Sequence, residues 1–405
     1  MLKEVTLFER VEPAPPDPIL GLTEAFRADS NPDKIDLSVG VYKDASNQTP
    51  VLKTVKQAEH QVLAHETSKN YLPIDGTDAY GHCVRRLMFG ADSDLVDSGL
   101  ATTSDTPGGT GALRVAGDYL HQSHPEATVW LSDPTWANHP AIFEAAGVPI
   151  KTYPYLDRQT NALAFDPMMA TLAKVPAGDM VLLHGCCHNP TGVDPTADQW
   201  LAIGRQLVAC GITPLLDFAY QGFADSLDSD AVGLHALYES CPEMLVCSSF
   251  SKNFGLYRER VGSLTVVSRN AQTTAAVQSR IKVGIRRNYS NPPSHGAAIV
   301  QTILGDGELT QQWHGELTQM RDRITGMRQL FADSLDHRSV QLNPDGNAFI
   351  TRQRGMFSFS GLTKDQVGQL RQKHSIYIVG SGRINVAGMT GQNMDRLCDA
   401  IASVM

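Results

Sequence analysis

Short apolar runs and helical patterns alternate through the middle of the chain. Apolar residues that recur every three or four positions predict helices, and the clearest of these covers residues 197–209. Short continuous apolar runs predict buried strands at residues 129–131, 180–184, 212–216, 245–248 and 263–267. Because strands that alternate with helices form parallel sheets, the pattern predicts an α/β protein with a mainly parallel sheet flanked by helices.

The pattern changes beyond residue 307. One long helical pattern covers residues 309–335, and strand candidates follow at residues 357–359 and 383–386. We interpret the long helix as a bridge into a second, smaller α/β domain. A further helical pattern at residues 19–26 and a short apolar segment at residues 35–41 precede the middle of the chain.

The N-terminal segment carries four prolines between residues 13 and 18. Such a run is stiff and extended, and it cannot form the interior of a helix. We therefore expect an N-terminal arm that lies on another part of the assembly, such as a partner subunit.

The composition excludes several classes of protein. The 405 residues are 42% hydrophobic, which is enough for more than one core, and the net charge is −9. No run of Lys or Arg provides the basic stripe that nucleic acid requires. The seven cysteines are odd in number and show no C-x-x-C spacing, so neither a zinc site nor a disulfide framework is predicted.

No segment has the features of a membrane or secretion signal. The longest apolar runs stay below the ~18 residues of a membrane span, and the N-terminal segment lacks the apolar core of a signal peptide. We expect a soluble cytoplasmic protein with reduced thiols, no bound metal and no membrane partner.

Three polar residues follow the ends of predicted strands. They are Asn189, Asp217 and Lys252. In open parallel sheets, ligands gather in the crevice outside the carboxyl ends of the strands, so an amide, an acid and an amine are predicted to meet there. Each residue alone is weak support, because an Asp after a strand often caps a helix or forms a turn, and most lysines are solvated.

A glycine-rich segment at residues 106–111 precedes a helical pattern at residues 112–120. Glycines allow backbone N–H groups to approach an anion, and the helix start adds its positive dipole end. The segment fits neither the G-x-G-x-x-G fingerprint of dinucleotide enzymes nor a P-loop. It predicts a phosphate site of another kind, with a simple tight turn as the alternative.

Arg260 lies eight residues after Lys252. Together with Ser249 and Ser251 it could complete a phosphate cradle, because a guanidinium group binds oxyanions through two hydrogen bonds. The alternative is a surface ion pair with Glu259.

Residues 248–262, Ser-Ser-Phe-Ser-Lys-Asn-Phe-Gly-Leu-Tyr-Arg-Glu-Arg-Val-Gly, resemble the cofactor-lysine signature of class I pyridoxal-phosphate-dependent aminotransferases. Residues 188–192, 217–222 and 381–383 resemble other motifs of that family. The resemblance extends from residue 17 to the C-terminus and is nearest to the bacterial aspartate and aromatic amino acid aminotransferases.

The resemblance implies the aspartate aminotransferase-like fold, in which a large domain holds a mainly parallel seven-stranded sheet. It divides the chain into an arm at residues 1–14, a small domain at residues 15–49 and 319–405, and a large cofactor-binding domain at residues 50–318. It also implies a homodimer whose active sites are shared across the interface.

The resemblance implies pyridoxal 5′-phosphate as the cofactor, held as a Schiff base on Lys252, which also moves the substrate proton. Asp217 would keep the pyridine nitrogen protonated, with His139 behind it. Tyr220 and Asn189 would bind the phenolic oxygen, and Trp136 would stack on the ring. The phosphate would be bound by Gly109, Thr110, Ser249, Ser251, Arg260 and, from the neighbouring subunit, Tyr71.

The substrate would be bound at both ends. Arg383, assisted by Asn189, would take the α-carboxylate, and Arg286 of the partner subunit would take a distal carboxylate, although Arg287 lies next to it. Gly40 and Phe357 would close over the substrate beside Trp136.

The expected reaction moves the amino group of aspartate, and of aromatic amino acids, to 2-oxoglutarate by a ping-pong mechanism through pyridoxamine phosphate. The dicarboxylate preference depends on rim positions that resemble the aspartate branch, namely Val41, Lys43, Thr49, Asn70, Thr110 and Asn291. The alternatives are an enzyme that prefers phenylalanine and tyrosine, a decarboxylase or lyase on the same fold, and a non-catalytic relative.

Overall fold

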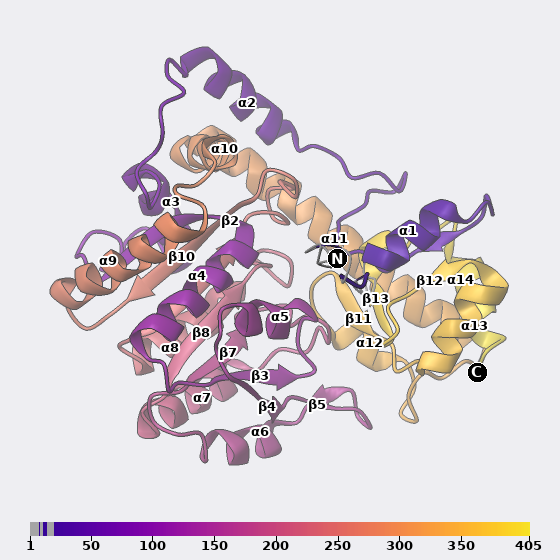
Figure 1. Cartoon of the computed structure of the whole chain (residues 1–405). Helices are drawn as coiled ribbons and strands as arrows, with labels where there is room; N and C mark the ends of the chain where they lie inside the picture. The colour runs from indigo at the N-terminus through magenta and orange to yellow at the C-terminus, as the bar shows by residue number, and fades with distance from the viewer. Residues whose placement is uncertain (1–7, 9–10, 14–19) are drawn as a thin grey trace, which may run out of the picture.

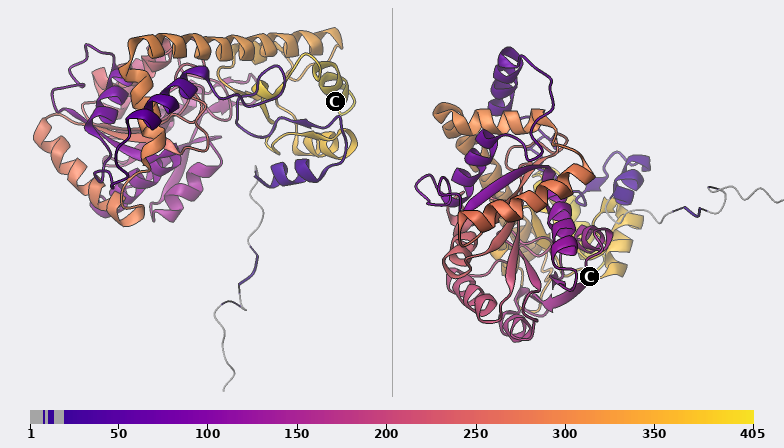
Figure 2. Two further views of the ribbon diagram at one scale, coloured as in Figure 1. Left: turned by 90° about the horizontal axis from the view of Figure 1, so that it is seen from above. Right: turned by 60° about the vertical axis from the view of Figure 1, so that its left-hand side comes forward.

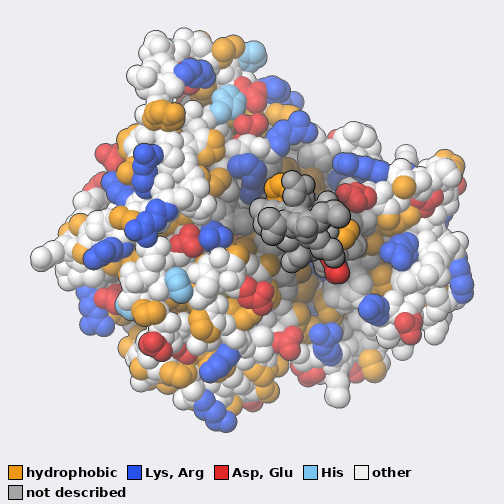
Figure 3. Space-filling model, in the orientation of Figure 1, with side chains coloured by type: hydrophobic (Ala, Val, Ile, Leu, Met, Phe, Trp, Pro, Cys, Tyr) orange, Lys and Arg blue, Asp and Glu red, His pale blue; other side chains and the backbone are white. Residues whose placement is uncertain are grey.

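The computed structural model describes residues 8, 11–13 and 20–405. Most of the predicted arm, and all of the proline-rich run except Pro13, lies outside these residues. Among the described residues, no helix is both long and apolar enough to cross a membrane. On the face shown in Figure 3, basic side chains lie among acidic ones.

A seven-stranded sheet forms the centre of the larger part of the molecule (Figure 1). Its strands, in spatial order, are β2 (Ala101–Pro107), β10 (Val261–Val267), β9 (Met244–Ser249), β8 (Thr213–Phe218), β7 (Met180–His184), β3 (Val129–Asp133) and β4 (Ile150–Pro154). Only β10 runs antiparallel to its neighbours, β2 and β9. The predicted seven-stranded, mainly parallel sheet is therefore confirmed.

Helices cover both faces of this sheet, and each face has its own hydrophobic core. In β7, the side chain of Leu182 belongs to one core, whereas Val181 and Leu183 belong to the other, as the alternation of side chains along a strand requires. The Leu182 core contains α4 (Gly108–Ser123), α5 (Asn138–Ala145) and α9 (Ala271–Asn288). The opposite core contains α6 (Phe165–Leu172), α7 (Ala197–Ala209) and α8 (Val232–Ser240).

The remaining helices of the larger part are α2 (Lys53–His65), α3 (Asp78–Phe89) and α10 (Ser294–Gly305), and β5 (Leu156–Asp157) pairs with β6 (Ala162–Leu163). The helix α11 (Gly307–His337) then runs from the larger part into a smaller unit (Figure 2). We call the segments at the far end of α11, together with residues 20–36, the small unit.

The small unit is built from both ends of the chain. Strand β1 (Ile35–Asp36) pairs in parallel with β12 (Ile376–Tyr377), and β11 (Phe357–Phe359) pairs antiparallel with β13 (Arg383–Asn385). Its helices are α1 (Leu20–Ala28), α12 (Ala348–Arg352), α13 (Lys364–His374) and α14 (Met394–Ala402). The division that we predict at residue 318 falls inside the continuous α11, so these domain limits stay a proposal.

A buried arginine on α11 ties the small unit to the rest of the chain. Arg328 is 3% exposed and donates hydrogen bonds to the carbonyl oxygens of Ile350 (3.2 Å), Gly355 (2.7 Å) and Phe357. Its burial lowers the pKa of the guanidinium to about 10, which still leaves it charged at neutral pH. A single buried side chain on α11 thus contacts three carbonyl groups of the segment that leads to Phe357.

We expect Arg328→Met to lower the free energy of unfolding by about 3 kcal/mol, because three buried carbonyls lose a charged donor. Urea denaturation would measure the loss. Arg205→Met, on an exposed position of α7, is the matched control and should change the stability by less than about 0.5 kcal/mol. Equal effects of the two substitutions would contradict the structural role of Arg328.

Candidate active site

One cavity of about 550 Å³ lies between the edge of the sheet and the small unit. Thirteen of the predicted site residues line it: Gly40, Gly109, Thr110, Trp136, Asn189, Asp217, Tyr220, Ser249, Ser251, Lys252, Arg260, Phe357 and Arg383. His139 lies just behind the wall, whereas Tyr71 and Arg286 do not line this cavity.

The direction of the strands explains why distant residues converge. The parallel strands β7, β8 and β9 end at the same edge of the sheet, and Asn189 and Lys252 follow β7 and β9 there, while Asp217 lies near the end of β8. Because β10 is antiparallel, its first residues lie at this edge as well: Gly262 pairs with Ser249, and Arg260 comes directly before the strand. The segment that joins β9 to the antiparallel β10 thus places both the Lys252 amine and the Arg260 guanidinium group at this edge.

A buried chain of hydrogen bonds supports Asp217 at the floor of the cavity. Its Oδ2 lies 3.0 Å from Nε2 of His139, whose Nδ1 lies 2.8 Å from the hydroxyl of Thr135. His139 is fully buried and its ring meets the Trp136 ring edge to face, with centroids 5.2 Å apart. The imidazole therefore orients both the carboxylate and the aromatic wall.

The surroundings of Asp217 favour its ionised form. Burial opposes ionisation of Asp217, but the hydrogen bond and charge of His139 and the charge of Lys252 outweigh it and lower the pKa of Asp217 below 3.8. Asp217 is thus ionised at neutral pH and presents a fixed negative charge to any ligand above it.

The amine of Lys252 points toward the same space. Its Nζ lies 4.7 Å from the centre of the Tyr220 ring. Burial lowers the pKa of Lys252, and the charges of Arg260 and Arg383 lower it further, although Asp217 opposes this shift. A lowered pKa favours the neutral amine, which is the form that attacks carbonyl groups and accepts protons.

One end of the cavity gathers groups that suit an anion. The first turn of α4 contains Gly109 and Thr110, whose N–H groups lack partners within the helix. A Cβ at Gly109 would lie 3.1 Å from that of Ser249, so the glycine allows the two loops to approach. Arg260 donates to the carbonyl oxygens of Tyr257 (3.0 Å) and Pro107 (3.4 Å) rather than pairing with Glu259 among the described residues.

The other end presents a second guanidinium group. Arg383 donates to the side-chain oxygen of Asn189 (3.3 Å) and to the carbonyl oxygen of Ser38 (2.6 Å), and its Cζ lies 4.2 Å from the centre of the Phe357 ring. Its buried Nε has no partner among the described residues, and burial lowers its pKa to about 10. A buried cation with an unused donor is suited to an incoming carboxylate.

The strap at residues 38–42 closes this end. Asn385 donates to the carbonyl oxygens of Val39 (2.6 Å) and Val41 (2.9 Å). A Cβ at Gly40 would lie only 2.7 Å from the Phe357 ring, so a side chain there would push the ring or the strap away. The absence of a side chain at Gly40 thus lets the strap and Phe357 meet over the cavity.

Sequence reasoning missed Tyr257, which also lines the cavity. Its hydroxyl oxygen accepts a hydrogen bond from the backbone N–H of Tyr42 at 2.8 Å, so it joins the strap to the turn that carries Lys252. The only signal in the sequence was its place within residues 248–262, which does not identify its partner.

Tyr71 and Arg286 lie on the surface of the chain. Tyr71 is 92% exposed, and Arg286 is an exposed residue near the end of α9 that donates to the hydroxyl of Ser290. Arg287, its alternative, donates to the side chain of Gln122 (3.2 Å). Roles for Tyr71 and Arg286 require a second subunit and stay predictions.

Comparison with known proteins assigns the chain to a family. Residues 32–401 match the family model described as aminotransferase class I and II. The chain is 52% identical over 399 residues to an aspartate aminotransferase of Salmonella typhi, which covers 98% of this chain and all of that protein. It is 45% identical over 397 residues to an aromatic-amino-acid aminotransferase of Pseudomonas aeruginosa, with 98% of both chains covered.

A solved structure agrees with the sequence relatives. The aromatic-amino-acid aminotransferase of Burkholderia pseudomallei, covalently bound to pyridoxal phosphate, superposes with a TM-score of 0.95. It is 45% identical to this chain and covers 98% of it, and this chain covers 99% of that structure. The fold, the cavity and the relatives agree: this chain belongs to the class I and II aminotransferase family and is an aminotransferase.

Proposed function

We propose that this aminotransferase holds pyridoxal 5′-phosphate on Lys252 and moves the amino group of aspartate to 2-oxoglutarate through pyridoxamine phosphate. The observation that carries the proposal is the composition of one cavity. It combines the Lys252 amine and the Asp217 carboxylate with a guanidinium group at each end, Arg260 and Arg383.

The residues of the cavity fit this cofactor. The α4 N-terminus, Ser249 and Arg260 suit the phosphate dianion, and Trp136 suits the face of an aromatic ring. The Nε of Arg383, which has no partner among residues 20–405, is available for a substrate anion. When bound, the cofactor would supply a conjugated ring that withdraws electrons from the substrate carbon.

The protein groups around that ring would control charge and protons. The ionised Asp217, oriented by His139, would hold a proton on the pyridine nitrogen. The Lys252 amine would carry the proton that leaves the substrate α-carbon. Burial raises the pKa of Tyr220, so its hydroxyl stays protonated and can donate a hydrogen bond to a phenolic oxygen.

The relatives include aspartate and aromatic-amino-acid aminotransferases, so dicarboxylate and aromatic substrates must be compared. The identity to the aspartate aminotransferase is higher than that to the aromatic-amino-acid enzyme, which supports dicarboxylates. The alternative is a preference for phenylalanine and tyrosine, which the apolar lining residues Leu113, Trp136 and Phe357 favour.

We also propose a homodimer with shared sites. A lone chain exposes Tyr71 and Arg286 without giving either a place in its own cavity. In a dimer, Tyr71 would reach the phosphate site of the partner subunit. Arg286 would reach the distal carboxylate of a substrate bound in the partner's cavity. The cytoplasmic location expected from the sequence stays a prediction.

Replacing each of the two proposed carboxylate-binding arginines should affect a different set of substrates. Arg383→Leu is expected to lower kcat/KM for every amino acid by about a hundredfold or more, because all share the α-carboxylate. Arg286→Leu should lower it mainly for aspartate and glutamate. Steady-state kinetics with aspartate and phenylalanine would measure both, with Arg287→Leu as the neighbouring control. An equal loss for phenylalanine in Arg286→Leu would refute the division of roles.

The proposed function is tested by a single-turnover absorbance titration of the purified protein with aspartate, phenylalanine and tyrosine. Stoichiometric conversion of the bound cofactor into its pyridoxamine form is expected, with the largest second-order rate for aspartate. A larger rate for the aromatic substrates would favour the alternative. Turnover without this conversion would indicate a decarboxylase or lyase, and a failure to bind the cofactor would overturn the proposal.

A further inference from the structure

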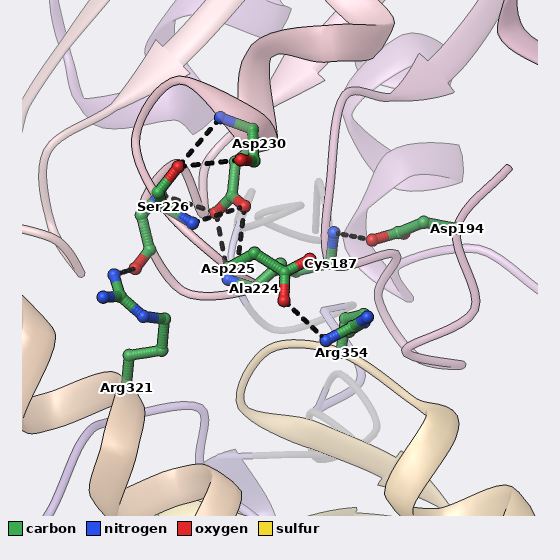
Figure 4. Close-up of polar contacts among 10 residues, drawn as sticks. Cys187, Asp194, Ala224, Asp225, Ser226, Asp230, Arg321 and Arg354 are labelled. Atoms are coloured by element: carbon green, nitrogen blue, oxygen red, sulfur yellow. Dashed lines mark hydrogen bonds and ion pairs between the residues drawn. The ribbon is translucent and has the colours of Figure 1, made fainter. Parts of the chain in front are cut away.

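Two carboxylates organise the turns that follow β7 and β8 (Figure 4). Asp194 accepts hydrogen bonds from the backbone N–H groups of Cys187 (2.7 Å) and His188 (2.8 Å). Asp230 accepts four backbone N–H groups in the next turn, those of Gly222, Ala224, Asp225 and Ser226. Only the first of these turns leads directly into Asn189, which lines the active-site cavity.

The turn held by Asp194 has a conformation that needs support. Cys187 has a φ of 50°, in the left-handed region, which costs a non-glycine residue about 1 kcal/mol or more. The next side chain, His188, is fixed between the hydroxyls of Ser132 (2.9 Å) and Thr191 (2.8 Å). The backbone just before Asn189 is therefore set by contacts outside the cavity.

The same turn is fastened to the small unit. The N–H of Gly192 donates to the carbonyl oxygen of His188 (2.7 Å), and the N–H of Arg354 donates to that of Gly192 (2.6 Å). The Arg354 guanidinium also pairs with Asp225 at 2.7 Å (Figure 4). A displacement of this turn would thus act on both Asn189 and the segment that carries Phe357.

We propose that Asp194 is a positioning residue for aminotransfer. By holding the amides of Cys187 and His188, it places the Asn189 carboxamide 3.3 Å from Arg383. The inference rests on the proposed role of Asn189 and Arg383 in binding the α-carboxylate. Burial raises the pKa of Asp194 to about 6, so the group is ionised at neutral pH, and both of its hydrogen bonds are charge-assisted.

Asp194→Asn tests the proposal, because the amide keeps the shape but turns one acceptor into a donor that faces an N–H group. We expect kcat/KM for the best amino-acid substrate to fall about tenfold or more, mainly through KM. In an Asn189→Ala background the same substitution should change kcat/KM by less than about twofold, because residues that act through one another are not additive.

Asp179→Asn is the matched control. Asp179 precedes β7 at the opposite edge of the sheet, is 5% exposed, and likewise accepts two N–H groups, from Thr128 (2.9 Å) and the Trp130 indole (2.8 Å). It should lose stability while its kcat/KM stays unchanged. Should Asp194→Asn fail to fold, Asp194→Ser leaves room for water at the two amides and repeats the comparison.

Unchanged kinetics in Asp194→Asn would overturn the proposal. So would an equal kinetic loss in Asp179→Asn, or a full additional loss in the Asn189→Ala background. The wild-type protein, measured alongside with aspartate and phenylalanine, tests the proposed function separately from the role of Asp194.

Discussion

Lys252→Ala is expected to abolish aminotransfer, lowering the turnover rate by about 10⁴-fold or more. The substitution removes both the amine that would hold the cofactor and the base that would carry the substrate proton. Within the part of the chain that the structure describes, no other lysine lines the cavity. The fold should survive, because burial of the Lys252 amine carries a desolvation cost in the native state that alanine does not have.

Single-turnover absorbance with aspartate would measure the loss, and circular dichroism would show whether the fold is kept. Lys174→Ala, at an exposed position, is the control and should behave like the wild type. Near-normal turnover by Lys252→Ala would show that another group carries the proton.

The second large effect is expected at Asp217. Replacing it by Ala should cost about 4 kcal/mol of transition-state stabilisation, roughly a thousandfold in rate, because the fixed charge that would hold the proton on the pyridine nitrogen is lost. Asp217→Asn separates charge from shape, since it keeps the contact with His139 but carries no charge. We expect it to be nearly as slow as Asp217→Ala.

The pH dependence gives a further check on Asp217. A pKa below 3.8 means that the native state gains stability from this ionised carboxylate above that pH and loses it as the pH falls through the lowered value. In Asp217→Asn, the free energy of unfolding should therefore fall less steeply than in the wild type as the pH is lowered through this range. A rate close to that of the wild type in Asp217→Asn would refute the electrostatic role.

The sequence predicts strands well where they are apolar and poorly where they are polar. The prediction for β7 matches its observed bounds, because all of its residues are buried and all but the last are apolar. Strand β2 was missed because Thr, Ser and Asp dominate it. Two of its polar side chains have distant partners: the hydroxyl of Thr103 lies 2.9 Å from that of Thr265, and the hydroxyl of Ser104 accepts a hydrogen bond from Gln278 at 2.9 Å.

A local sequence pattern also does not reveal whether a strand runs parallel or antiparallel to its neighbours. The apolar run of β10 looks like that of its parallel neighbours, and only its pairing reveals the antiparallel direction that brings Arg260 to the cavity. The same limit applies to Tyr257, whose partner Tyr42 is 215 residues away. Residues within compact motifs, such as Lys252 and Asn189, were predictable because the motif itself carries the information.

The contact between Arg383 and Ser38 spans 345 residues. At synthesis rates of about 5–20 residues per second, the ribosome makes Ser38 roughly 20 to 70 seconds before Arg383. During most of that interval β1 has no partner strand, because β12 has not yet been synthesised. All seven strands of the central sheet are made before residue 268, but the end of the cavity that contains Arg383 is complete only later. A chain that ends before Arg383 would therefore contain every strand of the central sheet but lack the guanidinium group that we propose for the α-carboxylate.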